Sequence, residues 1–167
     1  MRNKLFLILA LVLTLALTAT AQTKTTGTAS CAKPDPAYSI EVGDRAGHAL
    51  AISKSVCAWT KPMEIAGLKT KDGYDVAYGD ASGAKARGSG YHVSNMSNGD
   101  KIYVRFQGND TMKDGKPDTS EGTWSYSGGT GKLKGIKGKG TYKGKADASG
   151  NMVFEVEGDY ELPAAKK

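Results

Sequence analysis

The segment 126–145, YSGGTGKLKGIKGKGTYKGK, holds six lysines and seven glycines, and its composition suggests a chemistry more strongly than any other part of the chain. Glycine-rich loops grip phosphate when they fit Gly, four residues, then Gly-Lys-Ser/Thr. Gly131-Lys132-Leu133 and Gly138-Lys139-Gly140 both lack the final hydroxyl residue, and Lys134 stands where a dinucleotide fingerprint needs its third glycine. We therefore expect no nucleotide and no other cofactor.

Residues suited to acid–base or metal chemistry are few and scattered. His48 and His92 are the two histidines of the sequence, and neither lies in a recognisable catalytic or metal-binding motif. The acidic residues of 110–121 are expected on a turn-rich loop, and their spacing misses the calcium-loop pattern. The sequence therefore supports no assignment of a catalytic residue or a metal site.

The first 21 residues have the pattern of a secretory signal peptide. Arg2 and Lys4 precede an apolar run, and Ala19-Thr20-Ala21 supplies a small-x-small cleavage site before Gln22. A retained N-terminal anchor is the alternative. Cleavage would leave 146 residues and lower the net charge from +6 to +4. The sequence thus predicts a secreted or periplasmic protein with no stable membrane anchor after cleavage.

Cys31 and Cys57 are the two cysteines of the chain. Because an exported protein meets an oxidising compartment, we expect them to form a disulfide. Closing a loop of this size stabilises a fold by about 3 kcal/mol in the chain-entropy model. The alternative is two free thiols, with Cys57 buried beside Trp59.

Short alternating runs separated by Gly, Asn and Asp predict an all-β fold. Residues 22–35 are Thr-rich and are expected to form a flexible lead-in, 36–163 a single β-barrel domain, and 164–167 a frayed tail. About eight or nine strands are predicted, with a strong hairpin signal at Asn98-Gly99 and a polar loop at 79–90. The expected strands are 38–42, 48–59, 63–68, 74–78, 91–93, 101–107, 123–126, 136–146 and 152–162.

The lysines of the glycine-rich segment acquire partners if 136–162 is a hairpin centred on Ser149. In that register Lys143 lies opposite Glu155 and Lys137 opposite Glu161, while Tyr142 and Val156 share the other face. Because the positive side chains face carboxylates, the hairpin presents no open basic surface. We therefore expect no binding of nucleic acid.

The motif GGTGKLKGIKG of residues 128–138 resembles the GGTG-x-F-x-G-x-x-G signature of the barrel-like superfamily of allene oxide cyclase and dirigent proteins. The wider stretch 91–162 resembles a group of secreted bacterial barrel proteins of uncharacterised role. The resemblance implies a single antiparallel barrel of about eight strands with an apolar lumen, and a lipocalin-like barrel is the related alternative. Leu133 replaces the usual aromatic residue. Because no catalytic residue of the cyclases matches a position here, the resemblance implies a fold and no reaction.

Five residues are candidates for binding a ligand: Tyr91, His92, Tyr103, Arg105 and Trp124. The run 101–107 puts Tyr103 and Arg105 opposite an apolar face. If that apolar face lines the lumen, both residues lie outside in solvent; if it lies under loops or a subunit contact, they line a polar mouth. His92 is expected on the same side as Tyr103.

Three functions remain open from the sequence. The first is non-enzymatic binding of a small apolar or amphipathic molecule, or a structural role at the cell envelope. The second is an isomerase or cyclase acting in the lumen, which requires an ionisable group that points inward. The third is an oligomeric adhesion or matrix protein, and a homo-oligomer is compatible with each of them.

Overall fold

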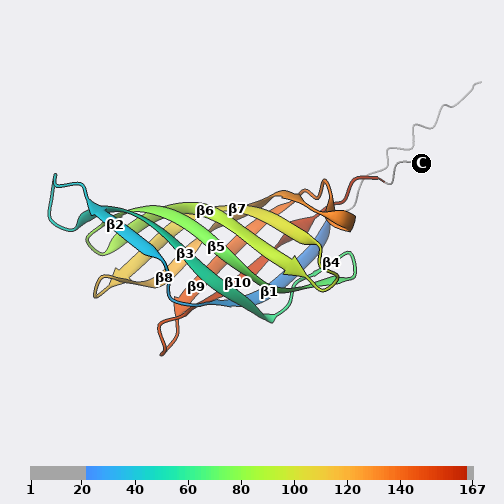
Figure 1. Ribbon diagram of the computed structural model, residues 1–167, viewed down its shortest axis with the longest axis horizontal. Helices are drawn as coiled ribbons and strands as arrows, with labels where there is room; N and C mark the ends of the chain where they lie inside the picture. The colour runs from blue at the N-terminus through green and yellow to red at the C-terminus, as the bar shows by residue number, and fades with distance from the viewer. Residues whose placement is uncertain (1–21, 165–167) are drawn as a thin grey trace, which may run out of the picture.

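The computed structural model describes residues 22–164, which are arranged almost entirely as β-strands (Figure 1). The expected signal peptide and residues 165–167 of the tail lie outside these described residues. Between 22 and 164, no helix has the length and apolar character needed to cross a membrane. The elements are β1 (Thr23–Cys31), β2 (Ala37–Glu41), β3 (His48–Lys61), β4 (Glu64–Ile65), β5 (Leu68–Ser82), β6 (Lys85–Met96), β7 (Lys101–Lys113), β8 (Lys116–Gly129), the 3-10 helix η1 (Gly131–Leu133), β9 (Lys139–Ala146) and β10 (Met152–Tyr160).

Eight antiparallel strands close into a barrel, which confirms the predicted fold class. Strands β5 to β10 pair in sequence order, β10 pairs with β1, β1 with β3, and β3 with β5. β2 lengthens the wall by pairing with the first half of β3, and β4 forms a short hairpin with β5. Closure gives each of the eight strands a neighbour on both sides and so removes open sheet edges from the barrel.

The expectation of a flexible lead-in at 22–35 is wrong, because Thr23–Cys31 is barrel strand β1 and pairs along its full length with β10. β-branched threonine favours extended backbone, but its run shows no apolar alternation. A Cβ on Gly27 would lie 2.6 Å from Cγ of Met63 and 2.8 Å from Cζ3 of Trp59, so the small residues make room for larger ones. The buried positions of β1 are Thr25, Gly27, Ala29 and Cys31.

The predicted loop at 79–90 is also wrong, since β5 and β6 continue to a tight turn at Gly83-Ala84. β7 and β8 likewise extend to the Asp114-Gly115 turn, so most of the acidic residues expected on a loop lie on strands. Gly, Ala and Asp have low strand propensity, which hides these extensions in the sequence. Small residues from three of these strands, β5, β6 and β7, face the interior: Gly79, Ala81, Ala86, Gly88 and Gly108.

The β9–β10 hairpin has the predicted register. Each pair from Ala146–Met152 to Gly140–Gly158 keeps its position around Ser149, and the isolated bridge Lys137–Glu161 continues it. β9 starts later than expected because η1 precedes it. Gly131 opens η1 with φ of +51°, and a side chain there would overlap the carboxylate of Asp100.

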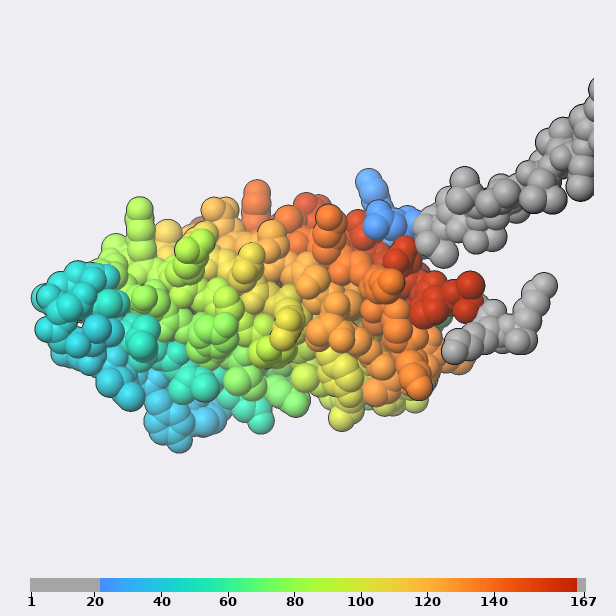
Figure 2. Space-filling model, turned by 90° about the horizontal axis from the view of Figure 1, so that it is seen from above, coloured from blue at the N-terminus to red at the C-terminus, as the bar shows by residue number. Residues whose placement is uncertain are grey.

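A hydrophobic plug fills the end of the barrel at which β4 and η1 lie (Figure 1). Helix η1 inserts Leu133, which is fully buried, and the β4–β5 hairpin inserts Ile65. The molecule is elongated, with the turn between β2 and β3 at the opposite end (Figure 2). The buried members of the plug are Ile65, Leu68, Met96, Ile102, Leu133 and Ile136.

Candidate functional site

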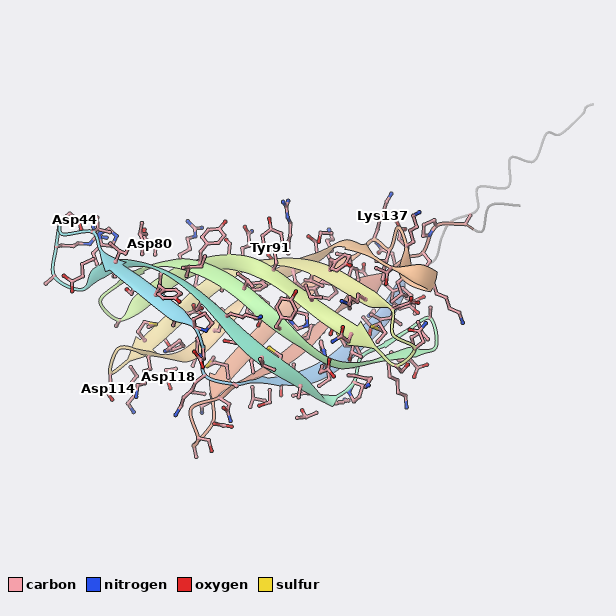
Figure 3. The ribbon with its side chains drawn as sticks, viewed as in Figure 1. Asp44, Asp80, Tyr91, Asp114, Asp118 and Lys137 are labelled. Atoms are coloured by element: carbon pink, nitrogen blue, oxygen red, sulfur yellow. A yellow bond between two sulfur atoms is a disulfide. The ribbon has the colours of Figure 1, made fainter. Side chains whose placement is uncertain are left out.

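The barrel interior beyond the plug contains a cavity of about 830 Å³. Trp59, Met63 and Val104 line it on the side of the plug. Its other side is bounded by Lys33 in the β1–β2 connection and by the turns at 113–117 and 147–150. Figure 3 shows Asp114 and Asp118 at the tip of the β7–β8 hairpin, on this side of the barrel. A chamber of this volume is large enough for one small molecule.

Two kinds of apolar side chain form the chamber wall. Alanines and glycines of β5 and β6 give a smooth surface on one side. On the other side Tyr142 meets Phe106 and Phe154 edge to face, with ring centroids 6.3 and 5.8 Å apart. The wall is therefore well suited to a flat or aliphatic apolar body.

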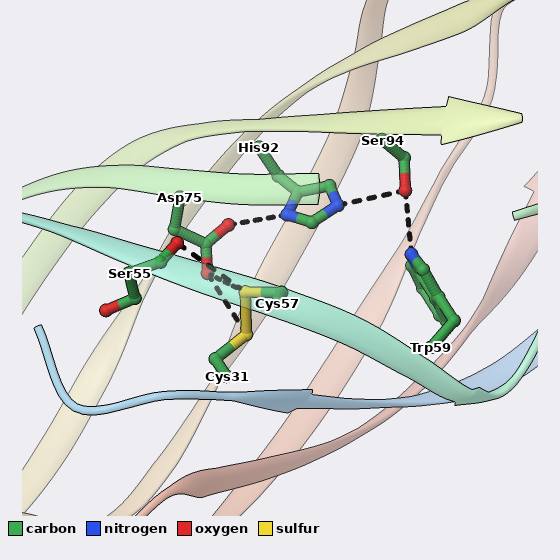
Figure 4. Close-up of a disulfide and its surroundings, with 7 residues drawn as sticks. All are labelled: Cys31, Ser55, Cys57, Trp59, Asp75, His92 and Ser94. Carbon is green, nitrogen blue, oxygen red and sulfur yellow. Dashed lines mark hydrogen bonds and ion pairs between the residues drawn. A yellow bond between two sulfur atoms is a disulfide. The ribbon is translucent and has the colours of Figure 1, made fainter. Parts of the chain in front are cut away.

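A hydrogen-bonded chain crosses the wall from β3 through β6 to β5 (Figure 4). Trp59 Nε1 donates to Ser94 Oγ over 2.7 Å, and His92 Nε2 lies 3.2 Å from the same oxygen. His92 Nδ1 lies 2.6 Å from Asp75 Oδ1. The order Asp–His–Ser resembles a nucleophilic triad, but Ser94 is fully buried and already accepts from Trp59.

The chain engages both ring nitrogens of His92. An indole N–H can only donate, so Ser94 Oγ is the acceptor in its contact with Trp59. Within residues 22–164, the side-chain contacts of Ser94 Oγ are the Trp59 indole and His92 Nε2. A neutral His92 that accepts from Ser94 at Nε2 carries its proton on Nδ1 and donates it to Asp75 Oδ1. Both ring nitrogens are occupied, so Asp75 is the member of the chain with capacity left for a ligand.

The predicted Cys31–Cys57 disulfide is confirmed, and it lies directly beside Asp75 (Figure 4). Asp75 Oδ2 is 3.5 Å from Sγ of Cys57 and 3.6 Å from Sγ of Cys31. Bonded sulfurs carry no hydrogen, so these are contacts and not hydrogen bonds. The two sulfurs are bonded to each other in the disulfide, so they provide no thiolates for a metal. A disulfide in this position points to an oxidising compartment.

A second polar group lies inside the barrel on β7, β8 and β9. Ser120 hydrogen-bonds to the carboxylate of Asp110 and to the phenol of Tyr142. Burial raises the pKa of Asp110, and the Ser120 hydrogen bond offsets part of that rise. Burial also raises the pKa of Tyr142 to about 12, with a further contribution from the charges of Asp110 and Asp75. Tyr142 is therefore an uncharged donor or acceptor facing the chamber.

Replacing Asp110 by Asn should stabilise the barrel at neutral pH. As pH rises above 3.8, the unfolded chain loses the Asp110 proton before the folded chain does, so the folded state loses stability until its own pKa is passed. Urea unfolding across roughly pH 3 to pH 8 measures this. The free energy of unfolding of Asp110→Asn minus that of the wild type should become more positive as pH rises. A shift in the opposite direction would contradict a desolvated carboxylate at this position.

The structure separates the five predicted ligand residues into two groups. His92 and Trp124 line the cavity, whereas Tyr91, Tyr103 and Arg105 face outward. The expectation that His92 shares a side with Tyr103 is wrong, because His92 lies opposite Val104 in the β6–β7 ladder. On the outside, Arg105 Nη2 donates to Tyr91 Oη over 3.0 Å, and its guanidinium lies 5.3 Å from the Tyr91 ring centroid. Figure 3 shows Tyr91 on the outer surface, where it borders an open furrow of about 1060 Å³.

The inward polar residues of β5 and β7 escaped the sequence analysis. In β5 the large residues Tyr74, Val76 and Tyr78 point outward, and Asp75 with Ala77 points into the lumen. Alternation shows that two faces differ, but it does not show which face is inside. The strand's small residues were the available signal, since a chamber wall needs them and a filled core does not.

An outer apolar face covers β2, β3, β5 and the middle of β6. It is continuous, because ladder pairs join Tyr38 to Ile52, Ile52 to Tyr78, and Val76 to Tyr91. The exposed large apolar side chains among residues 22–164 all belong to this face: Tyr38, Ile40, Val42, Leu50, Ile52, Val56, Tyr74, Val76, Tyr78 and Tyr91.

Comparison with known proteins supports the fold. No family model and no curated protein matches this chain. A protein of unknown function from the DUF3224 family of Shewanella oneidensis MR-1 has a similar structure, with a TM-score of 0.50 and 19% identity over 86% of this chain and 100% of that one. A pyocyanin demethylase gives a TM-score of 0.43 at 17% identity, over 80% of this chain and 98% of its own. A pterocarpan synthase dirigent protein gives 0.46 at 12% identity, over 88% of each chain. At these identities the likeness concerns the fold alone.

Proposed function

We propose that the barrel is a binding protein that holds one small apolar or amphipathic molecule in its lumen. The observation that carries this proposal is the cavity of about 830 Å³, in which apolar walls surround two small groups of hydrogen-bonding side chains. Natural ligand sites combine these two features. The side bounded by the β1–β2 connection and the two turns provides the entrance.

The distribution of side-chain size on β3 and β5 favours a chamber over a filled core. These strands carry Leu50, Ile52 and Val76, yet all three are exposed on the outer apolar face. Burying such a side chain stabilises a fold by about 1.5–3 kcal/mol, so an arrangement selected only for stability would turn them inward. The residues of β5 that face the lumen are instead small, such as Ala77 and Gly79. The placement of large side chains outside and small ones inside therefore favours an open chamber.

Filling the chamber should abolish retention of the ligand. Ala77→Phe places a ring in the lumen, and the matched variant Val76→Phe places the same ring on the outside of the same strand. Native mass spectrometry of protein purified from its own periplasm or medium should detect a bound small molecule in the wild type and in Val76→Phe, and none in Ala77→Phe. Near-ultraviolet circular dichroism checks that Ala77→Phe is folded. Equal retention by the two variants would contradict binding in the lumen.

Catalysis in the lumen is the second candidate, because ionisable groups do point inward. An isomerase or cyclase needs a base beside its substrate. His92 has both ring nitrogens engaged, so Asp75 Oδ2 is the atom positioned to take a proton. Conversion of the retained molecule by wild-type protein, lost in Asp75→Asn, would favour this function over simple binding.

Export and a role outside the cytoplasm remain part of the proposal. The disulfide supports an oxidising compartment. N-terminal sequencing of the protein recovered from periplasm or medium tests the expected cleavage between Ala21 and Gln22. A chain that retains its first residues in a membrane fraction would favour the anchored alternative.

Self-association is proposed from the outer apolar face, since contiguous exposed apolar surface of this kind marks interaction sites. Ile52→Lys places a charge near the centre of that face, whereas Thr123→Lys adds the same charge on the exposed side of β8. Light scattering after size exclusion should show an oligomer for the wild type and for Thr123→Lys, and a lower mass for Ile52→Lys. A monomeric wild type would also count against an adhesion or matrix role.

A further inference from the structure

One carboxylate oxygen in the chamber is left by the protein without a hydrogen-bond donor. Asp75 Oδ1 accepts from His92, but within residues 22–164 the polar-atom contacts of Oδ2 are the two disulfide sulfurs, which have no hydrogen to donate. The Asp75 side chain is only 21% exposed. A buried polar atom is normally paired, and a half-satisfied carboxylate in an apolar chamber calls for a partner.

The charges around the chamber are unbalanced. His92 uses Nδ1 for Asp75 Oδ1 and Nε2 for Ser94 Oγ, so it has no further N–H to offer to Asp75 Oδ2. Asp110 adds a second carboxylate to the wall. Among the described residues that line the cavity, the basic side chains are Lys33, Lys113 and Lys116, which belong to the connection and turn at the entrance. The deeper wall therefore carries carboxylates without lysine or arginine.

The aromatic side chains complete a site for a positive group with an apolar body. Trp59 lies beside the Asp75–His92 pair, with its ring 6.1 Å from the His92 ring. Phe106, Tyr142 and Phe154 form the wall on β7, β9 and β10. Ring faces attract ammonium groups, most strongly where water is excluded.

We propose that the lumen selects organic cations: molecules with a compact apolar or aromatic body and a protonated amino group that donates to Asp75 Oδ2, with Asp110 as the second negative group. This inference rests on the proposed function and specifies its ligand class. Because Oδ2 requires a donor as well as a charge, a primary ammonium should bind better than a quaternary one.

Three probes that share one ring system test the inference by isothermal titration calorimetry: tryptamine, 3-ethylindole and indole-3-propionate. Tryptamine should bind at least about tenfold more tightly than the other two. Asp75→Asn should remove most of that preference, and Asp110→Asn should reduce it less. Glu155→Gln removes one negative charge from the exposed side of β10 and should have no effect. The trimethylated derivative of tryptamine keeps the charge, lacks the donor, and should bind more weakly.

The outcomes separate this inference from the proposed function. Equal affinities for the three probes, an unchanged preference in Asp75→Asn, or no binding by tryptamine at millimolar concentration would each overturn selection of cations. If the wild type still retained a molecule that Ala77→Phe loses, the proposed binding function of the chamber would hold, and its ligand would belong to another class. Tightest binding by indole-3-propionate, weakened in Lys33→Gln, would assign the ligand's charge to the lysines at the entrance.

Discussion

A chain that begins at Ala32 should fail to form the barrel. Such a chain lacks β1, which supplies nine paired positions to β10 and further pairs to β3. Without it, β10 and the end of β3 from Cys57 to Lys61 become open edges, and the interior is exposed along the missing strand. The truncated chain should aggregate or unfold without cooperativity in urea, and its near-ultraviolet circular dichroism should be lost.

Two controls separate the loss of β1 from the effects of truncation and of losing the disulfide. A chain beginning at Gln22 keeps β1 and should unfold cooperatively. The full-length double variant Cys31→Ser, Cys57→Ser lacks only the disulfide and should lose about 3 kcal/mol while keeping a cooperative transition. Cooperative unfolding of the truncated chain with an unchanged denaturant slope would contradict the role of β1 in closure.

The parts of the fold that sequence analysis could predict are those where side-chain size and turn chemistry agree. In β9 and β10 lysines lie opposite carboxylates and apolar residues lie opposite one another, so one register satisfies both faces. Asn98-Gly99 fits the tight turn between β6 and β7 because Gly99 has a positive φ. The signal-peptide pattern predicted export into an oxidising compartment, and that expectation made the disulfide predictable before its geometry was known.

The parts that could not be predicted share one physical cause, which is that the barrel encloses space. A wall around a chamber is built from small residues, so β1 and the ends of β5 and β6 have the composition of loops. For the same reason the apolar alternation of β5 marks its outer side and conceals Asp75. Long-range pairing decides the direction in which a strand faces, and apolar alternation alone does not show which face is inside.

Trp124→Ala should be the most destabilising single substitution in the wall, with a loss of about 3–5 kcal/mol in free energy of unfolding. Trp124 is 6% exposed, and its ring lies 5.0 Å from that of Tyr126. Its Nε1 donates to the backbone oxygens of Thr141 at 3.1 Å and Glu157 at 3.2 Å, which ties β8 to both strands of the next hairpin. Urea unfolding measures the loss, and a value below about 1 kcal/mol would contradict this role.

Trp124→Phe distinguishes the ring from the indole N–H. This variant keeps an aromatic ring and loses only part of the packing. It also loses the hydrogen bond from Nε1 that Thr141 and Glu157 share, so the barrel should be less destabilised than by Trp124→Ala. The ring is accommodated because Gly140 and Gly158 have no side chain, and a Cβ on either would collide with its Cζ2 atom. Gly158→Val should therefore expel the ring and destabilise the barrel through the same contact. If Gly158→Val and Trp124→Ala act through one contact, the double variant should lose less than the sum of the two single losses. A Cβ on Gly158 would also collide with the backbone oxygen of Lys139, and additive losses would show that this backbone contact, and not the seating of Trp124, requires the glycine.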